Sequence, residues 1–124
     1  MKLEKVKIPD SLSASIHITG KIGFSSEATK SMGLDQDKFL QIAVNTDDVD
    51  DQNLYVFVTN VEDENSLKIS KAGNYFYANS KSLFDKLEID YRKKKVMFDI
   101  VEIEYEGEKI YKFIRREKDR DKSK

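Results

Sequence analysis

A run of four basic residues follows Tyr91 in the second half of the chain, at Arg92, Lys93, Lys94 and Lys95. Lysine and arginine side chains bind nucleic-acid phosphates, and they do so without reading the base sequence. Runs of charge are also typical of solvated turns between secondary-structure elements. The run therefore predicts either a phosphate-binding segment or a charged turn.

Two tyrosines alternate along a predicted strand, at Tyr75 and Tyr77, shortly after Lys71. Residues two apart on a strand share a face, and exposed aromatic faces stack on unpaired bases. Alternating aromatics also occur as cross-strand partners. With Arg115 and Arg116 near the end of the chain, the predicted nucleic-acid-binding set is Lys71, Tyr75, Tyr77, Arg92, Lys93, Lys94, Lys95, Arg115 and Arg116.

Acidic residues gather in one predicted turn, at Asp47, Asp48, Asp50 and Asp51. Carboxylate oxygens suit calcium, but this turn lacks the alternating aspartates, the central glycine and the closing glutamate of an EF-hand loop. A solvated hairpin tip is the favoured interpretation. We therefore predict no metal site.

Residue types that support catalysis are sparse. Glu102 and Glu104 share one strand face, as paired catalytic carboxylates do, but a wet sheet face accounts for them equally well. His17 is the single histidine and the chain has no cysteine. The sequence also contains no nucleophile elbow, glycine-rich phosphate loop or zinc-binding helix motif. These features predict a protein that is not an enzyme and carries no cofactor.

The composition is that of a folded chain of one domain. Its 124 residues include seven phenylalanines and six tyrosines, which supply core material although 36% of the residues are charged. The first residues lack the apolar segment of a signal peptide, and no run reaches membrane-spanning length. We expect a cytoplasmic protein without a membrane partner, with one domain at 1–114 and a charged flexible tail at 115–124.

Charge is distributed unevenly along the chain. Residues 1–64 contain six Lys and Arg against twelve Asp and Glu, whereas residues 65–124 contain sixteen against eleven. A basic half suits nucleic acid, DNA or RNA, as a partner. Complementary halves also suit head-to-tail association between copies of the chain. Nucleic-acid binding through the basic half is the leading hypothesis. The alternative is a phage or mobile-element assembly protein that self-associates.

Alternating apolar and polar residues predict strands at 15–19, 22–24, 39–44, 54–58, 67–70, 75–78, 96–105 and 109–114. Two short helices are predicted between them. The first has Ser25 or Ser26 as N-cap and Gly33 as its left-handed exit, and the second has Asn79 as N-cap and spans 80–87. The apolar face changes along 96–105, which predicts a bulge near Ile100.

The order strand, strand, helix, strand, strand occurs twice, in 15–60 and 67–114. Phe24 aligns with Tyr77 at a spacing of 53, and Tyr55 aligns with Tyr111 at a spacing of 56. Coincidence of alternating strands is the other interpretation of this pattern. Duplication predicts a β-rich α+β fold, in which two pseudo-symmetric ββαββ units form one compact barrel or sandwich with two short helices.

The segment GKIGFSSEATKSMGLDQDKFLQI, beginning at Gly20, resembles the AbrB-like swapped-hairpin domains of bacterial transition-state regulators and antitoxins. The matching positions are Gly20, Lys21, Ile22, Glu27, Met32, Gly33 and Leu34. Two such units in one chain also resemble the related cradle-loop barrels. The resemblance implies a barrel of interlocked hairpins, a DNA partner, and Lys21 and Lys30 as the matching DNA-contacting positions of the first half.

Overall fold

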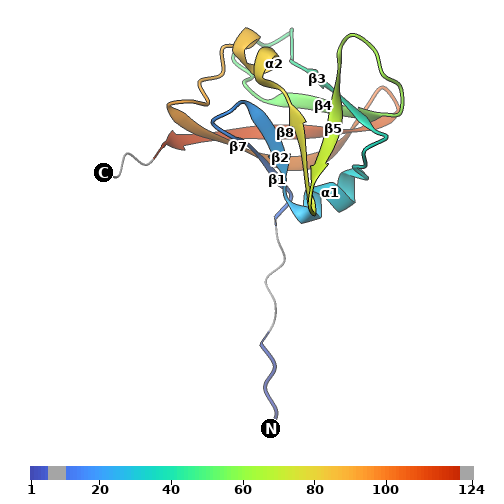
Figure 1. Ribbon diagram of the computed structural model, residues 1–124, viewed down its shortest axis with the longest axis vertical. Helices are drawn as coiled ribbons and strands as arrows, with labels where there is room; N and C mark the ends of the chain where they lie inside the picture. The colour runs from blue at the N-terminus through green and yellow to red at the C-terminus, as the bar shows by residue number, and fades with distance from the viewer. Residues whose placement is uncertain (6–10, 121–124) are drawn as a thin grey trace.

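The alternating segments form a closed antiparallel β-barrel in the computed structural model of the chain (Figure 1). The structure describes residues 1–5 and 11–120, which contain eight strands and two short helices. Their bounds are β1 Ser13–Ile16, β2 Lys21–Phe24, α1 Ser26–Met32, β3 Phe39–Ala43, β4 Leu54–Thr59, β5 Ser66–Ala72, β6 Tyr75–Asn79, α2 Lys81–Lys86, β7 Lys94–Tyr105 and β8 Glu108–Asp119.

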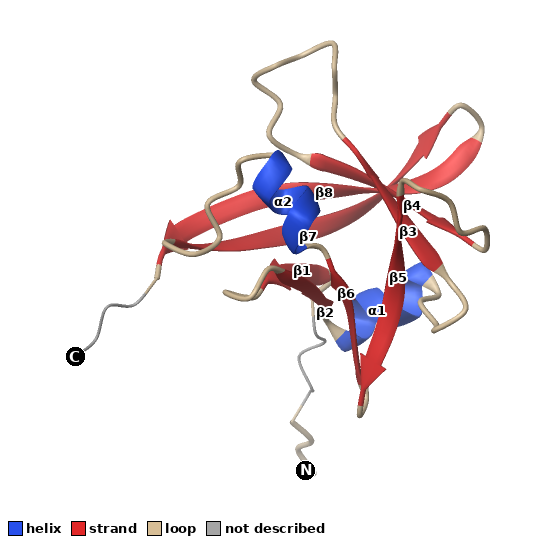
Figure 2. Ribbon diagram, turned by 45° about the horizontal axis from the view of Figure 1, so that its top comes forward, coloured by secondary structure: helices blue, strands red, loops and turns tan. Residues whose placement is uncertain are grey.

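Hydrogen bonds run around the barrel in the order β1-β2-β6-β5-β3-β4-β8-β7, and β7 returns to β1. α1 and α2 lie on opposite sides of the barrel in both ribbon views (Figure 1, Figure 2). The prediction of a β-rich barrel with two short helices is confirmed. Over the described residues, neither helix is long and apolar enough to cross a membrane.

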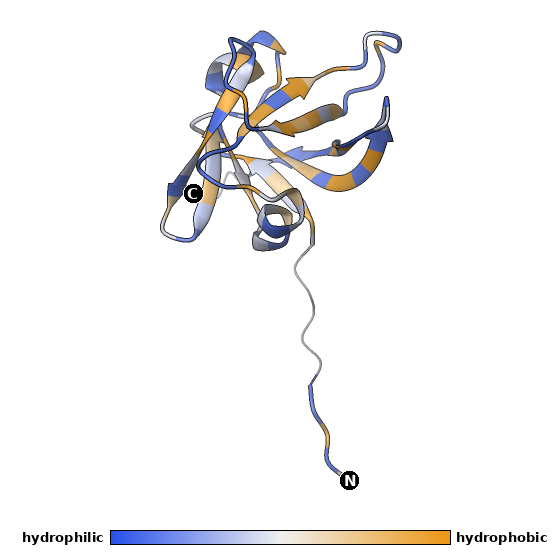
Figure 3. Ribbon diagram, turned by 90° about the vertical axis from the view of Figure 1, so that its right-hand side faces the viewer, coloured by the Kyte–Doolittle hydropathy of each residue, from blue (hydrophilic) through white to orange (hydrophobic). Residues whose placement is uncertain are grey.

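The interior is filled by every second residue of the strands. Ile22, Val96, Phe98 and Phe113 are fully buried. Hydrophobic and hydrophilic residues alternate along the strands of the ribbon in Figure 3. The helices and the segments that follow them add Met32, Leu34, Phe84, Ile89 and Tyr91 to the same core. Because the period of a strand is two, this core fixes which side chains point to solvent.

α1 begins and ends as its sequence predicts. The Ser25 Oγ accepts the Ala28 N–H at 3.1 Å, which caps the first turn, and Gly33 ends the helix at φ 64°. Glu27 lies in the first turn, where the helix dipole favours a negative charge. Ala28 and Met32 turn toward the core.

α2 differs from the prediction at its start. Asn79 is the last residue of β6, and Ser80 is the N-cap. The Ser80 side chain makes no capping bond; its Oγ donates to the Gly20 carbonyl oxygen at 2.8 Å instead. The hydroxyl is therefore used to hold the β1–β2 turn against the start of α2.

The β7–β8 hairpin departs from the predictions in two respects. Its register is unbroken from Lys94 to Tyr105, so the bulge predicted near Ile100 is wrong. Glu102 and Glu104 keep the inward phase but are exposed, because the hairpin continues past the packed interior. β8 also continues to Asp119, so a flexible tail beginning at residue 115 is wrong for 115–119; residues 121–124 lie outside the described residues.

The residue-by-residue alignment of the two halves is wrong by one position in places. Phe24 is buried in the core, whereas Tyr77 lies at an outward position beside Gly23. Tyr55 is likewise outward and Tyr111 buried. A slip of one residue exchanges the two faces of a strand, so these pairs do not occupy equivalent sites.

Gly20 is held where a side chain does not fit, and replacing it tests the contact between the β1–β2 turn and α2. Its φ is 93°, and a Cβ there would lie 2.6 Å from the Lys81 Cβ and 2.8 Å from the Lys81 Cα. We expect Gly20→Ala to lower the free energy of unfolding in urea by about 3 kcal/mol, because backbone strain and overpacking add. Gly33→Ala is the control, since it introduces positive φ without a close neighbour and costs about 1 kcal/mol. Equal losses for the two variants would contradict this contact.

Candidate nucleic-acid interface

A row of outward-facing residues crosses five neighbouring strands of the barrel. Register places Tyr77 beside Gly23, Gly23 beside Ser15, Ser15 beside Met97, and Met97 beside Arg116. At the usual strand spacing, such a row is about 19 Å long. The row joins an aromatic strand, β6, to a basic strand, β8, across the short side chains of β1 and β2.

A polar groove of about 440 Å³ lies over this row. It is lined by Ser11, Ser13, Ala14, Ser15, Gly23, Phe24, Ser25, Tyr75, Lys95, Met97 and Arg116. Glycine at position 23 is needed because a Cβ there would lie 1.4 Å from the Tyr75 hydroxyl oxygen. The Tyr75 side chain thus lies across Gly23 and forms one wall of the polar groove.

The aromatic wall consists of two nearly parallel rings. The ring centroids of Tyr75 and Tyr77 are 6.1 Å apart with an interplanar angle of 19°. The Lys21 ammonium lies 4.8 Å from the Tyr77 centroid. Tyr75 is 48% exposed, so about half of this residue remains accessible to solvent. Partial burial raises the pKa of Tyr75, which keeps the phenol neutral at physiological pH.

The basic wall continues into a cluster of cations at the base of the β7–β8 hairpin. Lys95 and Lys118 are direct cross-strand partners and, with Arg120 and Asp119, line an adjoining hollow, in which Asp119 pairs with Lys94. No carboxylate of the described residues lies within 4.0 Å of either lysine. The Arg120 guanidinium donates to the carbonyl oxygens of Tyr91 and Ile16. Because like charges placed directly opposite destabilise a sheet, this cluster is suited to an anion.

Arg116 lines the groove, but the carboxylate of Asp99 offsets part of its positive charge. Its Nε lies 2.8 Å from Asp99 Oδ2 and a second guanidinium nitrogen lies 3.1 Å from Asp99 Oδ1. This paired geometry orients the guanidinium beside Met97 and Lys95. The lysines therefore contribute more unpaired positive charge to the groove than Arg116 does.

The structure brings together only part of the predicted binding set. Tyr75, Lys95 and Arg116 line the groove, and Tyr77 is adjacent. Lys71 lies on the other face of the sheet from Tyr75 and Tyr77, since its cross-strand partner is Phe76. Its ammonium lies 5.5 Å from the Phe76 centroid. The Arg115 side chain is 16% exposed, pairs with Glu117 and lies outside the groove.

The remaining predicted cations lie at the turn between α2 and β7. Arg92 covers the Tyr91 ring at 4.7 Å and lies 3.5 Å from Asp85. The pKa of Asp85 is lowered chiefly because its carboxylate accepts a hydrogen bond from the Tyr91 hydroxyl. Lys94 pairs with Asp119 at 3.2 Å, and Lys93 is exposed. This part of the basic run is therefore largely engaged within the protein.

Several residues of the interface escaped the prediction. The serines of β1 carry no signal of their own in the sequence, whereas Lys118 and Arg120 were indicated only as general basic residues of the predicted tail. Lys21 was indicated only by the family resemblance, and it does lie beside the groove. Lys30, the other position so indicated, is exposed on α1 with Glu27 4.0 Å away. Cross-strand register, which brings Lys118 to Lys95, is the signal that a single sequence lacks.

The acidic loop between β3 and β4 is organised around one carboxylate. Asp51 accepts hydrogen bonds from the Tyr55 hydroxyl at 2.6 Å, the Asn53 N–H at 2.9 Å and the Asn45 amide at 3.1 Å. These bonds, led by that from Tyr55, lower the pKa of Asp51 to about 2. Residues 1–5 and 11–120 contain no group of three side chains placed to hold a metal ion.

No protein-family model, curated protein or solved structure matches the chain.

The Asp51 carboxylate makes the free energy of unfolding depend on pH in the acidic range. Its pKa is about 2 in the folded protein against an ordinary value of 3.8, so the unfolded chain binds more protons between these values. Stability should therefore fall as pH drops from about 4 to 2. We expect Asp51→Asn to flatten this part of the profile of unfolding free energy against pH. Glu104→Gln, which removes an exposed carboxylate on β7, is the matched control. A profile unchanged by Asp51→Asn would contradict the assignment.

Proposed function

We propose that this protein binds single-stranded nucleic acid in the polar groove across β6, β2, β1, β7 and β8. The observation that carries the proposal is the placement of two stacked tyrosines and an unpaired pair of lysines on opposite sides of a floor of small residues. Aromatic platforms beside a basic track are the recurring means of binding single strands without base-specific contacts. The protein acts as a binding module and needs no catalytic group for this role.

The tyrosines favour a single strand over a duplex. A base stacks on Tyr75 only when its own face is free, and bases within a duplex are already stacked on their neighbours. The floor of Ser13, Ser15 and Gly23 leaves room for a strand to lie close to the sheet. The hydroxyls of the serines offer hydrogen bonds to sugar or phosphate oxygens.

Lys95 and Lys118 contribute the electrostatic attraction for the phosphates of the nucleic acid. Lys95 and Lys118 repel each other across the strand pair, and a phosphate between them removes that cost. Each phosphate neutralised on a single strand adds about 0.7 to the slope of log affinity against log salt. Binding should thus be strong at low salt and weaken steeply as salt is raised.

The barrel is consistent with a duplicated unit, which we include in the proposal. Exchanging β1 to β4 with β5 to β8 reproduces the observed strand pairings, since β1–β2 becomes β5–β6, β1–β7 becomes β5–β3, and β4–β8 and β2–β6 map onto themselves. Swapped-hairpin barrels of the AbrB-like type have this interlocked arrangement. The relation to that family stays a prediction.

Fluorescence anisotropy with labelled oligonucleotides tests the proposal. We expect single-stranded DNA or RNA to bind more tightly than duplex at low salt. Tyr75→Leu should weaken binding about fivefold to thirtyfold, because one base stack is lost. Changing Lys95 and Lys118 to Gln should lower the salt slope by about 0.7, because the phosphate between them is no longer neutralised.

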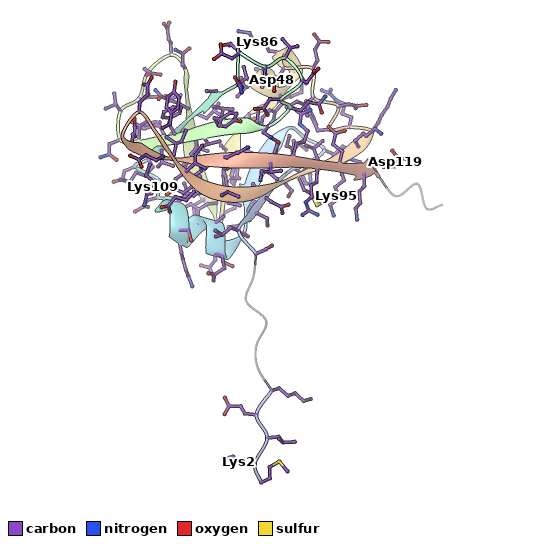
Figure 4. The ribbon with its side chains drawn as sticks, turned by 180° about the vertical axis from the view of Figure 1, so that it is seen from behind. Lys2, Asp48, Lys86, Lys95, Lys109 and Asp119 are labelled. Atoms are coloured by element: carbon purple, nitrogen blue, oxygen red, sulfur yellow. The ribbon has the colours of Figure 1, made fainter. Side chains whose placement is uncertain are left out.

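Two variants of the same type serve as controls. Tyr105→Leu removes a tyrosine that is equally exposed, at 49%, but lies outside the groove, and Lys109→Gln removes a lysine at the other end of the hairpin (Figure 4). Both should bind like the unmodified protein. The absence of binding at low salt, or equal losses for Tyr75→Leu and Tyr105→Leu, would overturn the proposal.

Head-to-tail self-association is a second candidate, and one observation favours it. The tip of the β7–β8 hairpin carries Glu102, Glu104, Glu106 and Glu108, whereas its base carries the lysine cluster, so the hairpin is charged oppositely at its two ends. An interface of this kind repeats without closing. Light scattering should then show an apparent mass that rises with protein concentration and falls with salt. A mass that stays that of one chain at every concentration would exclude this candidate.

A further inference from the structure

A second hollow lies on the outer face of β3, β4 and the tip of the β7–β8 hairpin, away from the polar groove. Its volume is about 330 Å³. It is lined by Ala43, Val44, Asn45, Thr46, Asp47, Tyr55, Phe57, Tyr105 and Ile110, and we call it the aromatic pocket. Three of these residues present aromatic rings, and the carboxylate of Asp47 is the charged group of the lining.

The rings of the aromatic pocket meet at right angles. The centroids of Phe57 and Tyr105 are 6.1 Å apart with an interplanar angle of 86°. Tyr55 and Phe57 are two apart on β4 and share its outer face. In this edge-to-face contact one ring points its edge at the other, and the aromatic rings in the lining offer their remaining negative faces to an ammonium group.

The charge around the pocket reinforces this preference. The Tyr55 hydroxyl donates to the ionised Asp51 at 2.6 Å, which makes the ring of this lining residue more electron-rich. Asp47 lies in the lining, Glu108 is the cross-strand partner of Tyr105, and Glu106 follows Tyr105 at the hairpin tip. Lys112 is the cross-strand neighbour of Tyr55, but it is not part of the lining, and the carboxylates outnumber it.

We propose that the aromatic pocket receives the cationic end of a lysine side chain presented by a basic segment of a partner protein. A single ammonium group does not fill the pocket, so the chain that carries it has room to enter as well. Val44 and Tyr105, both in the lining, are nearly half exposed and give the flanking peptide an apolar surface. The acidic rim complements the positive charge of a basic segment rather than of an isolated small ion.

Nuclear magnetic resonance titration with short peptides tests the proposal on the intact protein. Three peptides that differ at one position carry lysine, trimethyl-lysine or norleucine in a Gly-Ser background. We expect the two cationic peptides to shift the resonances of Tyr55, Phe57 and Tyr105 and the norleucine peptide to have little effect. Equal binding of the norleucine peptide would identify an apolar groove and overturn the proposal.

Tyr105→Leu tests whether binding needs the aromatic ring itself or only an apolar surface of similar size. It should weaken binding of the cationic peptides about threefold to tenfold, because one cation–π contact is lost. Tyr75→Leu, at a tyrosine of the same exposure in the polar groove, is the matched control and should leave peptide binding unchanged. Equal effects of the two variants would contradict the assignment of the pocket.

Two further results would assign the pocket to another occupant. Free choline that binds as tightly as the cationic peptides would make the occupant a small molecule and overturn the peptide partner. Concentration-dependent association of the protein that Tyr105→Leu abolishes would make the occupant a second copy of the chain, with the same consequence. Peptide binding that survives both tests would support the proposal.

Discussion

Closure of the sheet into a ring is the constraint on which both candidate sites depend. In a closed ring every strand has a neighbour on each side, so a strand cannot rotate about its axis without breaking two ladders. Burial of Ile22, Ala78 and Val96 on the inner face therefore forces Gly23, Tyr77 and Met97 outward. Pairing between β1 and β7 completes the ring and brings the aromatic strand within reach of the basic one.

The β7–β8 hairpin connects the two sites mechanically. Its base supplies Lys95, Arg116 and Lys118 to the polar groove, and its tip supplies Tyr105 and Ile110 to the aromatic pocket. The separation from Lys95 to Tyr105 along β7 is about 33 Å at the usual rise per residue. Continuous pairing with β8 stiffens this length, so the two sites keep a fixed relative position.

Local signals in the sequence predicted the elements well. Alternation predicted all eight strands, although the first lies at Ser13–Ile16 and not at 15–19, and the capping residue Ser25 with the glycine exit Gly33 located α1. The errors arose where local and tertiary demands differ. Ser80 bonds to Gly20 at the end of the neighbouring strand instead of capping its own helix, and Glu102 keeps an inward phase where no interior remains.

The candidate sites were predictable only in part, because each is assembled across strands. Tyr75, Tyr77 and Lys95 were singled out by type and spacing, but Gly23 and Ser15 have no local signature, and the pairing of Lys118 with Lys95 is set by cross-strand register. Arg92, Lys94 and Arg115 belong to the same basic stretches and yet are engaged by Asp85, Asp119 and Glu117. Charge density along a sequence does not report which cations remain unpaired after folding.

The pairing of Ser13 with Asp99 affects how the chain folds while it is being synthesised. β1 emerges from the ribosome early, whereas β7, its second neighbour in the sheet, is made only after most of the chain has been synthesised. Until then the edges of the unfinished sheet offer unpaired amide and carbonyl groups to any passing strand. The edge of β1 that pairs with β7 therefore stays without its native partner until late in synthesis, and mispairing at this edge is avoided only once β7 is in place.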